Sequence, residues 1–166
     1  SYLTAKLNNY FSESSLIKYR INVEINYFLE LCKIIPSLKK ISKSKKKEIQ
    51  LIAKKISIND IKKVKKIESK INHDVKAVEY FIKDKFLKIG LTKHIEYIHF
   101  GLTSQDINNT ATPLLLKDSL EHVFYVELEK IIAKLQKISS DWSKVSMLAK
   151  THGQPASPTK MGKEIA

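Results

Sequence analysis

The amino-acid sequence predicts an all-α fold, in which an N-terminal helical domain leads into the start of a long helical bundle. Three observations support this prediction. Apolar residues recur at intervals of three and four over most of the 166 residues, which is the spacing of one helix face. Capping residues, prolines and glycines interrupt this pattern where helices are expected to begin and end. Alternation of apolar and polar residues, which is typical of strands, is nowhere sustained.

The first long helix is predicted to begin after Ser12, whose hydroxyl can accept a hydrogen bond from the first turn. It ends before Pro36, which cannot continue a helix. Its apolar face consists of Leu16, Tyr19, Val23, Tyr27, Leu31 and Ile34. Cys32 is the only cysteine of the chain and is expected to be a core residue without a disulfide partner.

Three further helices are expected before residue 91. The lysine-rich segment 41–56 forms a short exposed helix. The sequence Ser57-Ile-Asn-Asp60 has the form of a capping box and opens the next helix. Asn72 ends that helix and can cap the one that follows, and Gly90 terminates the latter.

Thr103-Ser-Gln-Asp106 opens a last, long helix, which Pro113 is expected to kink. Beyond the proline the apolar residues are spaced almost as heptads, and we expect them to be buried in a helical bundle. They are Leu120, Phe124, Leu128, Ile131, Leu135, Ile138, Trp142 and Val145. The predicted domains are therefore residues 1–102, the N-terminal helical domain, and residues 103–166, the beginning of the central bundle.

The net charge of +13 raises the question of a nucleic-acid partner. Of the 30 basic residues only Arg20 is an arginine, whereas specific recognition of bases and phosphates relies on arginine. The lysines are also spread along the chain. We therefore interpret them as a solvated surface and expect no nucleic-acid partner.

Composition and motifs exclude several other classes. The chain has no apolar run of about 18 residues, so no membrane span is expected, and we expect a cytoplasmic protein. It has no HExxH or CxxC motif and no glycine-rich phosphate loop, so neither a metal site nor a cofactor is predicted. The chain starts with serine and stops within what reads as a new helix, and we expect it to be part of a longer protein.

Three polar segments lie where helices are interrupted: Asn72-His73-Asp74, Thr103-Ser104 and the run 151–158. Helix N-termini carry free N–H groups and a partial positive charge, which suit carboxylates and phosphates. His152 is a candidate for proton transfer. Each segment also has a purely structural interpretation, as caps or as a turn. Ser157, before Pro158, is expected to cap the final helix.

In the same order, the segments 72–80, 100–111 and 151–166 resemble those of adenylosuccinate lyases, in the fumarase/aspartase superfamily. The similarity extends from Phe11 onward. It implies a β-elimination that releases fumarate from adenylosuccinate, and from the succinylated aminoimidazole carboxamide ribotide, in de novo purine nucleotide synthesis. It also implies a nucleotide substrate, no cofactor, and a homotetramer whose subunits share active sites.

The resemblance also implies roles for individual residues. His152 would be the general acid that protonates the departing nitrogen. Asn72, His73 and Asp74 would contact the substrate, and Thr103 and Ser104 would bind its succinyl carboxylate. The base and the phosphate-binding pair of the family are not among these 166 residues, so the chain by itself is expected to be inactive.

Two alternatives remain open on the sequence. One is another enzyme of the superfamily, an argininosuccinate lyase or a cycloisomerase. The other is a non-enzymatic, lysine-rich helical module that binds nucleic acid.

Overall fold

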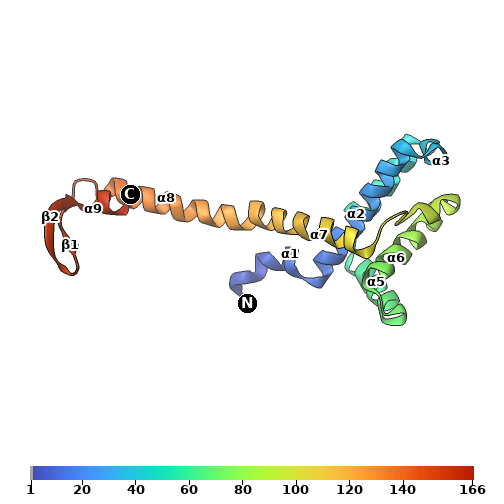
Figure 1. Cartoon of the computed structure of the whole chain (residues 1–166), viewed down its shortest axis with the longest axis horizontal. Helices are drawn as coiled ribbons and strands as arrows, with labels where there is room; N and C mark the ends of the chain where they lie inside the picture. The colour runs from blue at the N-terminus through green and yellow to red at the C-terminus, as the bar shows by residue number, and fades with distance from the viewer. Residues whose placement is uncertain (1) are drawn as a thin grey trace. The chain divides into compact units, whose positions relative to one another are not determined.

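The computed structural model describes residues 2–166, and it confirms a predominantly helical fold (Figure 1). One short hairpin is the exception. The elements in chain order are η1 (Tyr2–Leu7), α1 (Asn8–Phe11), α2 (Glu13–Ile34), α3 (Pro36–Lys39), α4 (Lys43–Lys54), α5 (Ile58–Ile71), α6 (Asp74–Lys88), η2 (Thr92–Tyr97), α7 (Ser104–Ser119), η3 (Leu120–Phe124), α8 (Tyr125–Asp141), β1 (Ser146–Thr151), β2 (Gln154–Lys160) and α9 (Met161–Ile165).

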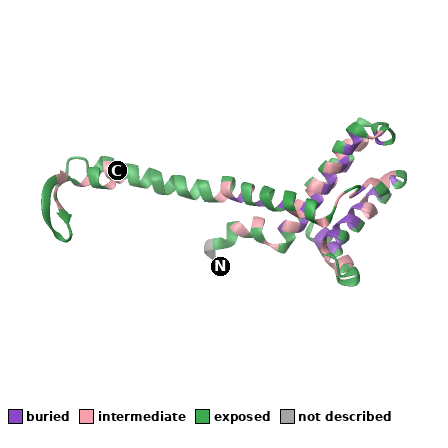
Figure 2. Ribbon diagram, viewed as in Figure 1, coloured by how far each residue is buried: buried purple, intermediate pink, exposed green. Residues whose placement is uncertain are grey.

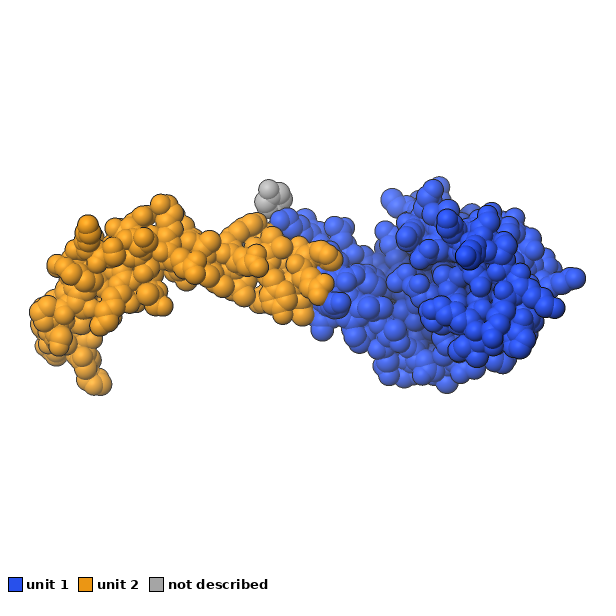
Figure 3. Space-filling view, turned by 90° about the horizontal axis from the view of Figure 1, so that it is seen from above, with its two compact units in different colours: residues 1–119 blue, residues 120–166 orange. Residues whose placement is uncertain are grey.

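The chain packs as two units, which divide after Ser119 (Figure 3). Helix α7 belongs to the first unit because it packs against α2. It continues through Pro113 as far as Ser119, where the backbone changes to the π-helix η3. The domain boundary expected after Leu102 stays a prediction.

Helix α2 is the centre of the first unit, since α4, α5, α6 and α7 all pack against it. Apolar side chains of α2 meet those of α6, and the rings of Phe28 and Phe86 lie edge to face with centroids 4.8 Å apart. Cys32 is buried in this core, as expected, and has no disulfide. Figure 2 shows the buried positions concentrated on these helices. The largest fully buried apolar side chains of the described residues are Phe28, Phe81, Phe86, Ile21, Ile25, Leu38, Ile49, Ile82 and Ile107.

Three of the predicted cap and stop signals of the first unit are confirmed, at Ser12, Ser57 and Gly90. The Ser12 hydroxyl accepts a hydrogen bond from the Ser15 N–H at 3.2 Å. Ser57 and Asp60 form the complete capping box at the start of α5. Gly90, which follows α6, has a φ of +76°, a left-handed conformation that glycine adopts without steric cost.

The second unit differs from the prediction in containing an antiparallel hairpin, β1–β2. Ser157 and Pro158 lie within β2 and do not start a helix, which begins only at Met161. Both strands of a two-stranded sheet are edges, where a proline without an N–H is tolerated. Pro158 therefore sits opposite Leu148 without breaking the hairpin.

The apolar stripe of α8 is exposed in this chain, contrary to the expected burial. Trp142 is 43% exposed and Ile131 58%, and Gly162 is the only buried residue among those described from 120 to 166. The heptad spacing was interpreted as core, but the described residues supply no partner for this face. No described helix is long and apolar enough to cross a membrane.

Candidate functional site

The turn between α5 and α6 holds the first predicted site segment. Asn72 has a left-handed backbone, with φ +54°, and ends α5 by donating its N–H to the Glu68 carbonyl at 2.8 Å. The prediction that Asn72 can cap α6 is wrong. His73 caps this helix, because its Nδ1 accepts the N–H of Lys76 at 3.2 Å. With Nδ1 engaged in this bond, Nε2 of the exposed imidazole is the ring nitrogen that remains for another partner.

Asp74 is held on both carboxylate oxygens. Its Oδ1 accepts the N–H of Val75 at 2.8 Å, and its Oδ2 lies 2.7 Å from Nη2 of Arg20. Burial by itself would raise the pKa of the Asp74 carboxyl, but the Val75 N–H and the Arg20 guanidinium outweigh it and lower this pKa. Asp74 is therefore a fixed carboxylate at neutral pH.

The second predicted segment begins α7. Thr103 donates both its backbone N–H and its hydroxyl to Oδ2 of Asp106, at 2.7 and 2.8 Å. The hydroxyl of Thr103 is thus engaged as a cap. Ser104, which is half-buried, and the free N–H groups of the first turn are the remaining donors that an anion could use at this helix end.

Arg20 of α2 connects these two segments. Its Nε donates to Oδ1 of Asn108 at 2.9 Å, while its Nη2 is paired with Asp74. Asn108 lies four residues after Ser104, on the same face of α7 one turn further on. The structure thus brings the start of α6 and the start of α7 to one buried arginine.

A second buried charge on α2, Glu24, contacts a residue to which the sequence analysis assigned no function. Oε1 of Glu24 lies 2.5 Å from Nδ1 of His99, and Oε2 has no hydrogen-bond partner among the described residues. Burial raises the pKa of the Glu24 carboxyl, although the contact with His99 acts in the opposite direction. His99 itself has a φ of +61°, which is unusual for a residue with a side chain.

A signal for this pair is present in the sequence. Glu24 is a carboxylate on the apolar side of a helix, four residues after Arg20. Buried charges require partners, so both residues pointed to polar groups packed on α2. The pattern could not identify His99 as one of them, because His99 is 75 residues away along the chain.

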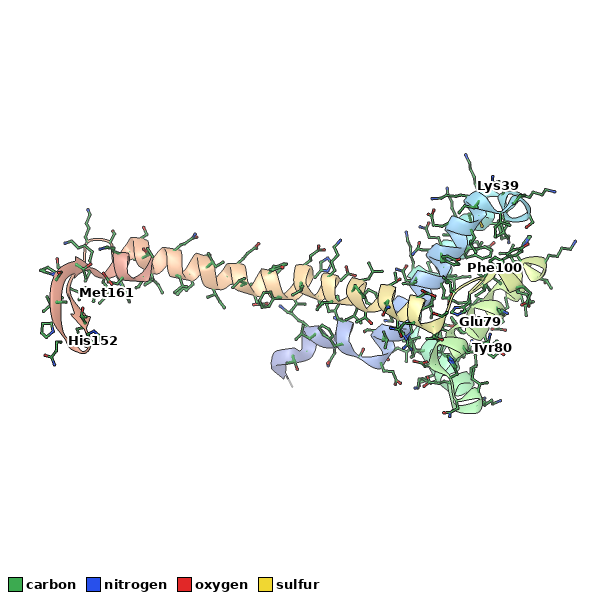
Figure 4. The ribbon with its side chains drawn as sticks, viewed as in Figure 1. Lys39, Glu79, Tyr80, Phe100, His152 and Met161 are labelled. Carbon is green, nitrogen blue, oxygen red and sulfur yellow. The ribbon has the colours of Figure 1, made fainter. Side chains whose placement is uncertain are left out.

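His152 belongs to the second unit and lies in the turn of the β1–β2 hairpin (Figure 4). Thr151 and Gln154 pair across the hairpin, which leaves His152 and Gly153 as the two turn residues. Their φ values are +51° and +78°, as a type I′ turn requires. Asparagine, aspartate and glycine are the usual residues at such positions, so a histidine here is held in an unfavourable backbone conformation. Its side chain is exposed.

No group of three or more metal-ligating side chains occurs within residues 2–166 as described.

Comparison with known families places the chain. A family profile described as "Lyase" matches residues 3–166. The chain therefore belongs to this lyase family.

Among curated proteins, the chain is similar to adenylosuccinate lyases, which confirms the resemblance. It is 47% identical to the enzyme of Dictyostelium discoideum over 96% of this chain and 35% of the relative. It is 39% identical to the enzyme of Buchnera aphidicola, in a match that covers 100% of this chain and 37% of the relative. The chain thus spans little more than a third of the length of these relatives.

Solved structures show the same fold at lower identity. A fumarate lyase from Mesorhizobium has a TM-score of 0.73 at 20% identity, and the match covers 96% of this chain and 35% of that one. A β-carboxy-cis,cis-muconate cycloisomerase from Acinetobacter calcoaceticus has a TM-score of 0.67 at 21% identity, with 96% and 36% coverage. At this level of identity, these two structures establish the fold of the chain and not its activity.

Proposed function

We propose that the protein to which this chain belongs is a C–N lyase that releases fumarate from adenylosuccinate and leaves AMP. The same β-elimination acts on the succinylated aminoimidazole carboxamide ribotide, in cytoplasmic de novo purine nucleotide synthesis. The observation that carries this proposal is the 47% identity to an adenylosuccinate lyase over 96% of this chain. The activity is assigned to the whole protein, of which this chain corresponds to about a third of the relatives' length.

In this proposal His152 is the general acid. Cleavage of the C–N bond leaves electrons on the departing nitrogen, and a protonated imidazole can supply the proton that neutralises them. The type I′ turn supports this role, because left-handed backbone at both His152 and Gly153 fixes the direction in which the hairpin presents the histidine. An unfavourable backbone conformation that persists at an exposed histidine is typical of a functional site.

The N-terminal ends of α6 and α7, which both pack against α2, bind the substrate. The N-terminus of α7 offers free N–H groups and the Ser104 hydroxyl to the succinyl carboxylate, with Thr103 shaping that turn. At the start of α6, His73 can offer Nε2 to the substrate, and Asn72 and Asp74 lie on either side of it in the sequence. Both ends carry polar groups of fixed orientation, which is what recognition of a nucleotide with several anionic groups requires.

The active form is a homotetramer with shared active sites. The exposed apolar face of α8 supports this assembly, because such a face is stable in water only when other helices cover it. Covering it would also give the His152 hairpin a rigid base.

The deciding experiment replaces His152 in the full-length protein by asparagine and by alanine. Asparagine tolerates left-handed backbone, so His152→Asn should keep the melting temperature while fumarate release from adenylosuccinate falls by about 10²- to 10⁴-fold. Lys150→Asn, which alters an exposed position of the same hairpin, serves as the matched control and should retain turnover. Turnover of His152→Asn within a few-fold of the wild type would exclude the acid role.

A further inference from the structure

Arg20 is the single arginine of the chain, and it is only 8% exposed on the buried, mainly apolar side of α2, which also carries Glu24. An isolated buried cation would strongly destabilise the fold, so the role of Arg20 is best inferred from the groups that it contacts. Those partners come from two other helices: Asp74 of α6 and Asn108 of α7.

The geometry of these contacts requires a guanidinium. Nη2 pairs with Oδ2 of Asp74 at 2.7 Å, and Nε donates to Asn108 at 2.9 Å. Two donors fixed in one plane therefore determine the separation and the orientation of two helices at once. A lysine, with a single ammonium on a flexible stem, could engage either partner but would not fix both.

Asp74 is presented to the solvent and is not buried with the arginine. The Asp74 side chain is 47% exposed, against 9% for that of Arg20. The buried guanidinium of Arg20 therefore fixes the position of the Asp74 carboxylate from its protein side. The solvent-facing side of this carboxylate stays accessible to a ligand.

We propose that Arg20 is a positioning residue that holds the Asn72–Asp74 segment and the first two turns of α7 in one arrangement. Its contribution to substrate binding rests on the function proposed above. Arg20 does not itself contact substrate in this account, and it acts through Asp74 and Asn108.

The test uses the full-length protein with Arg20→Met, Arg20→Lys and a matched control, Lys85→Met. The control breaks another ion pair of the first unit, the partly buried pair between Lys85 and Asp60 at 2.8 Å, whose residues lie outside the two segments. Hydrogen–deuterium exchange of peptides covering 72–78 and 103–109 measures the arrangement without any assay of activity. Both peptides should exchange faster in Arg20→Met, relative to the rest of the first unit, and neither should do so in Lys85→Met.

Turnover is the second readout. Arg20→Met should lower kcat/KM for adenylosuccinate by on the order of 10²-fold per folded molecule, as small misplacements of binding groups do, and Arg20→Lys should restore only part of it. Adding Arg20→Met to Asp74→Asn should cause less than its full separate loss, since the two residues act through one contact.

Unchanged exchange of both peptides in Arg20→Met would overturn the positioning role. So would a kcat/KM within about twofold of the active wild type. A wild-type enzyme that releases no fumarate would instead refute the proposed function, and the exchange measurement would then decide on Arg20 by itself.

Discussion

At the residue scale, the buried charges of the first unit serve two purposes. Arg20 and Glu24 lie one turn apart on α2. Arg20 pairs with Asp74 of the candidate site, whereas Glu24 contacts His99, which lies outside the candidate site segments. Asp60 and Glu79 are paired instead with lysines of α6. Asp60 pairs with Lys85, and Glu79 pairs with Lys83. We expect Arg20 to determine the geometry of the candidate site, and the lysine pairs of Asp60 and Glu79 to contribute to the stability of the unit.

Asp60 should make folding depend on pH. Burial by itself would raise its pKa, but hydrogen bonds from Lys85 and Ser57 lower it to about 2. Because the folded pKa lies below the unfolded value of about 3.9, the stabilisation is complete above that value. It is lost as the pH falls towards 2.

The amount at stake is about 2 kcal/mol of unfolding free energy. Asp60→Asn should accordingly flatten the acid limb of the unfolding free energy, measured by urea denaturation of the full-length protein between pH 5 and pH 2. An acid limb identical to that of the wild type would show that Asp60 is not the group responsible.

Single residues explain which parts of the fold could be predicted. Ser12, Ser57 and Gly90 act on their own neighbours in sequence, so their caps and stops could be inferred from the chain directly. Arg20 was noted only as a rarity of composition, because its partners lie 54 and 88 residues away. Long-range polar contacts of this kind leave no local pattern.

At the scale of elements, α9 packs so closely on the end of α8 that only glycine fits at position 162. A Cβ there would lie 2.1 Å from the Ser139 carbonyl oxygen and 2.8 Å from the backbone of Ser143. These are backbone atoms, which cannot rotate away.

Gly162→Ala should therefore cost about 1–3 kcal/mol and lower the melting temperature of the full-length protein. Gly153→Ala is the comparison, since its Cβ would meet nothing within 4 Å and only its φ of +78° opposes the change, at about 1 kcal/mol. If the two variants had the same melting temperature, the close approach at Gly162 would not be a determinant of stability.

The exposed face of α8 should control assembly. Leu135→Lys places a charge on the apolar stripe and is expected to shift the full-length protein from the proposed tetramer to smaller species, measured by sedimentation velocity. Gln136→Lys introduces the same side chain about 100° further around the helix and should leave the assembly intact. Equal oligomeric states in both variants would remove the stripe from the interface.

The hairpin shows why one element was not predicted. Ser146–Thr151 contains no clear alternation, and the two prolines of β2 argued against a strand. The informative signal was His152-Gly153, a pair of residues in the place where Asn-Gly is usual for a two-residue turn. The run was interpreted as a break between helices because helices preceded and followed it.

At the scale of the whole molecule, the two units differ in how they are stabilised. The first has a continuous apolar core. The second has, among its described residues, no buried apolar side chain. His152 is therefore carried by a unit whose described residues form no apolar core of their own.

The 166-residue chain by itself should accordingly show no release of fumarate from adenylosuccinate, measured by absorbance at micromolar protein. Backbone amides of residues 120–166 should also exchange much faster than those of α2. Turnover by the purified chain would show that neither additional packing nor additional residues are needed.

The hairpin leaves and rejoins the helical backbone at adjacent points. The N–H of Met161 donates to the Val145 carbonyl at 2.9 Å, and that of Gly162 to the Trp142 carbonyl at 3.1 Å. Residues 146–160 thus form a loop closed at its base, which could be lengthened, shortened or exchanged for another without displacing α8 or α9. The turn that carries His152 is in this respect a replaceable module, and its side chains can change independently of the helices that carry it.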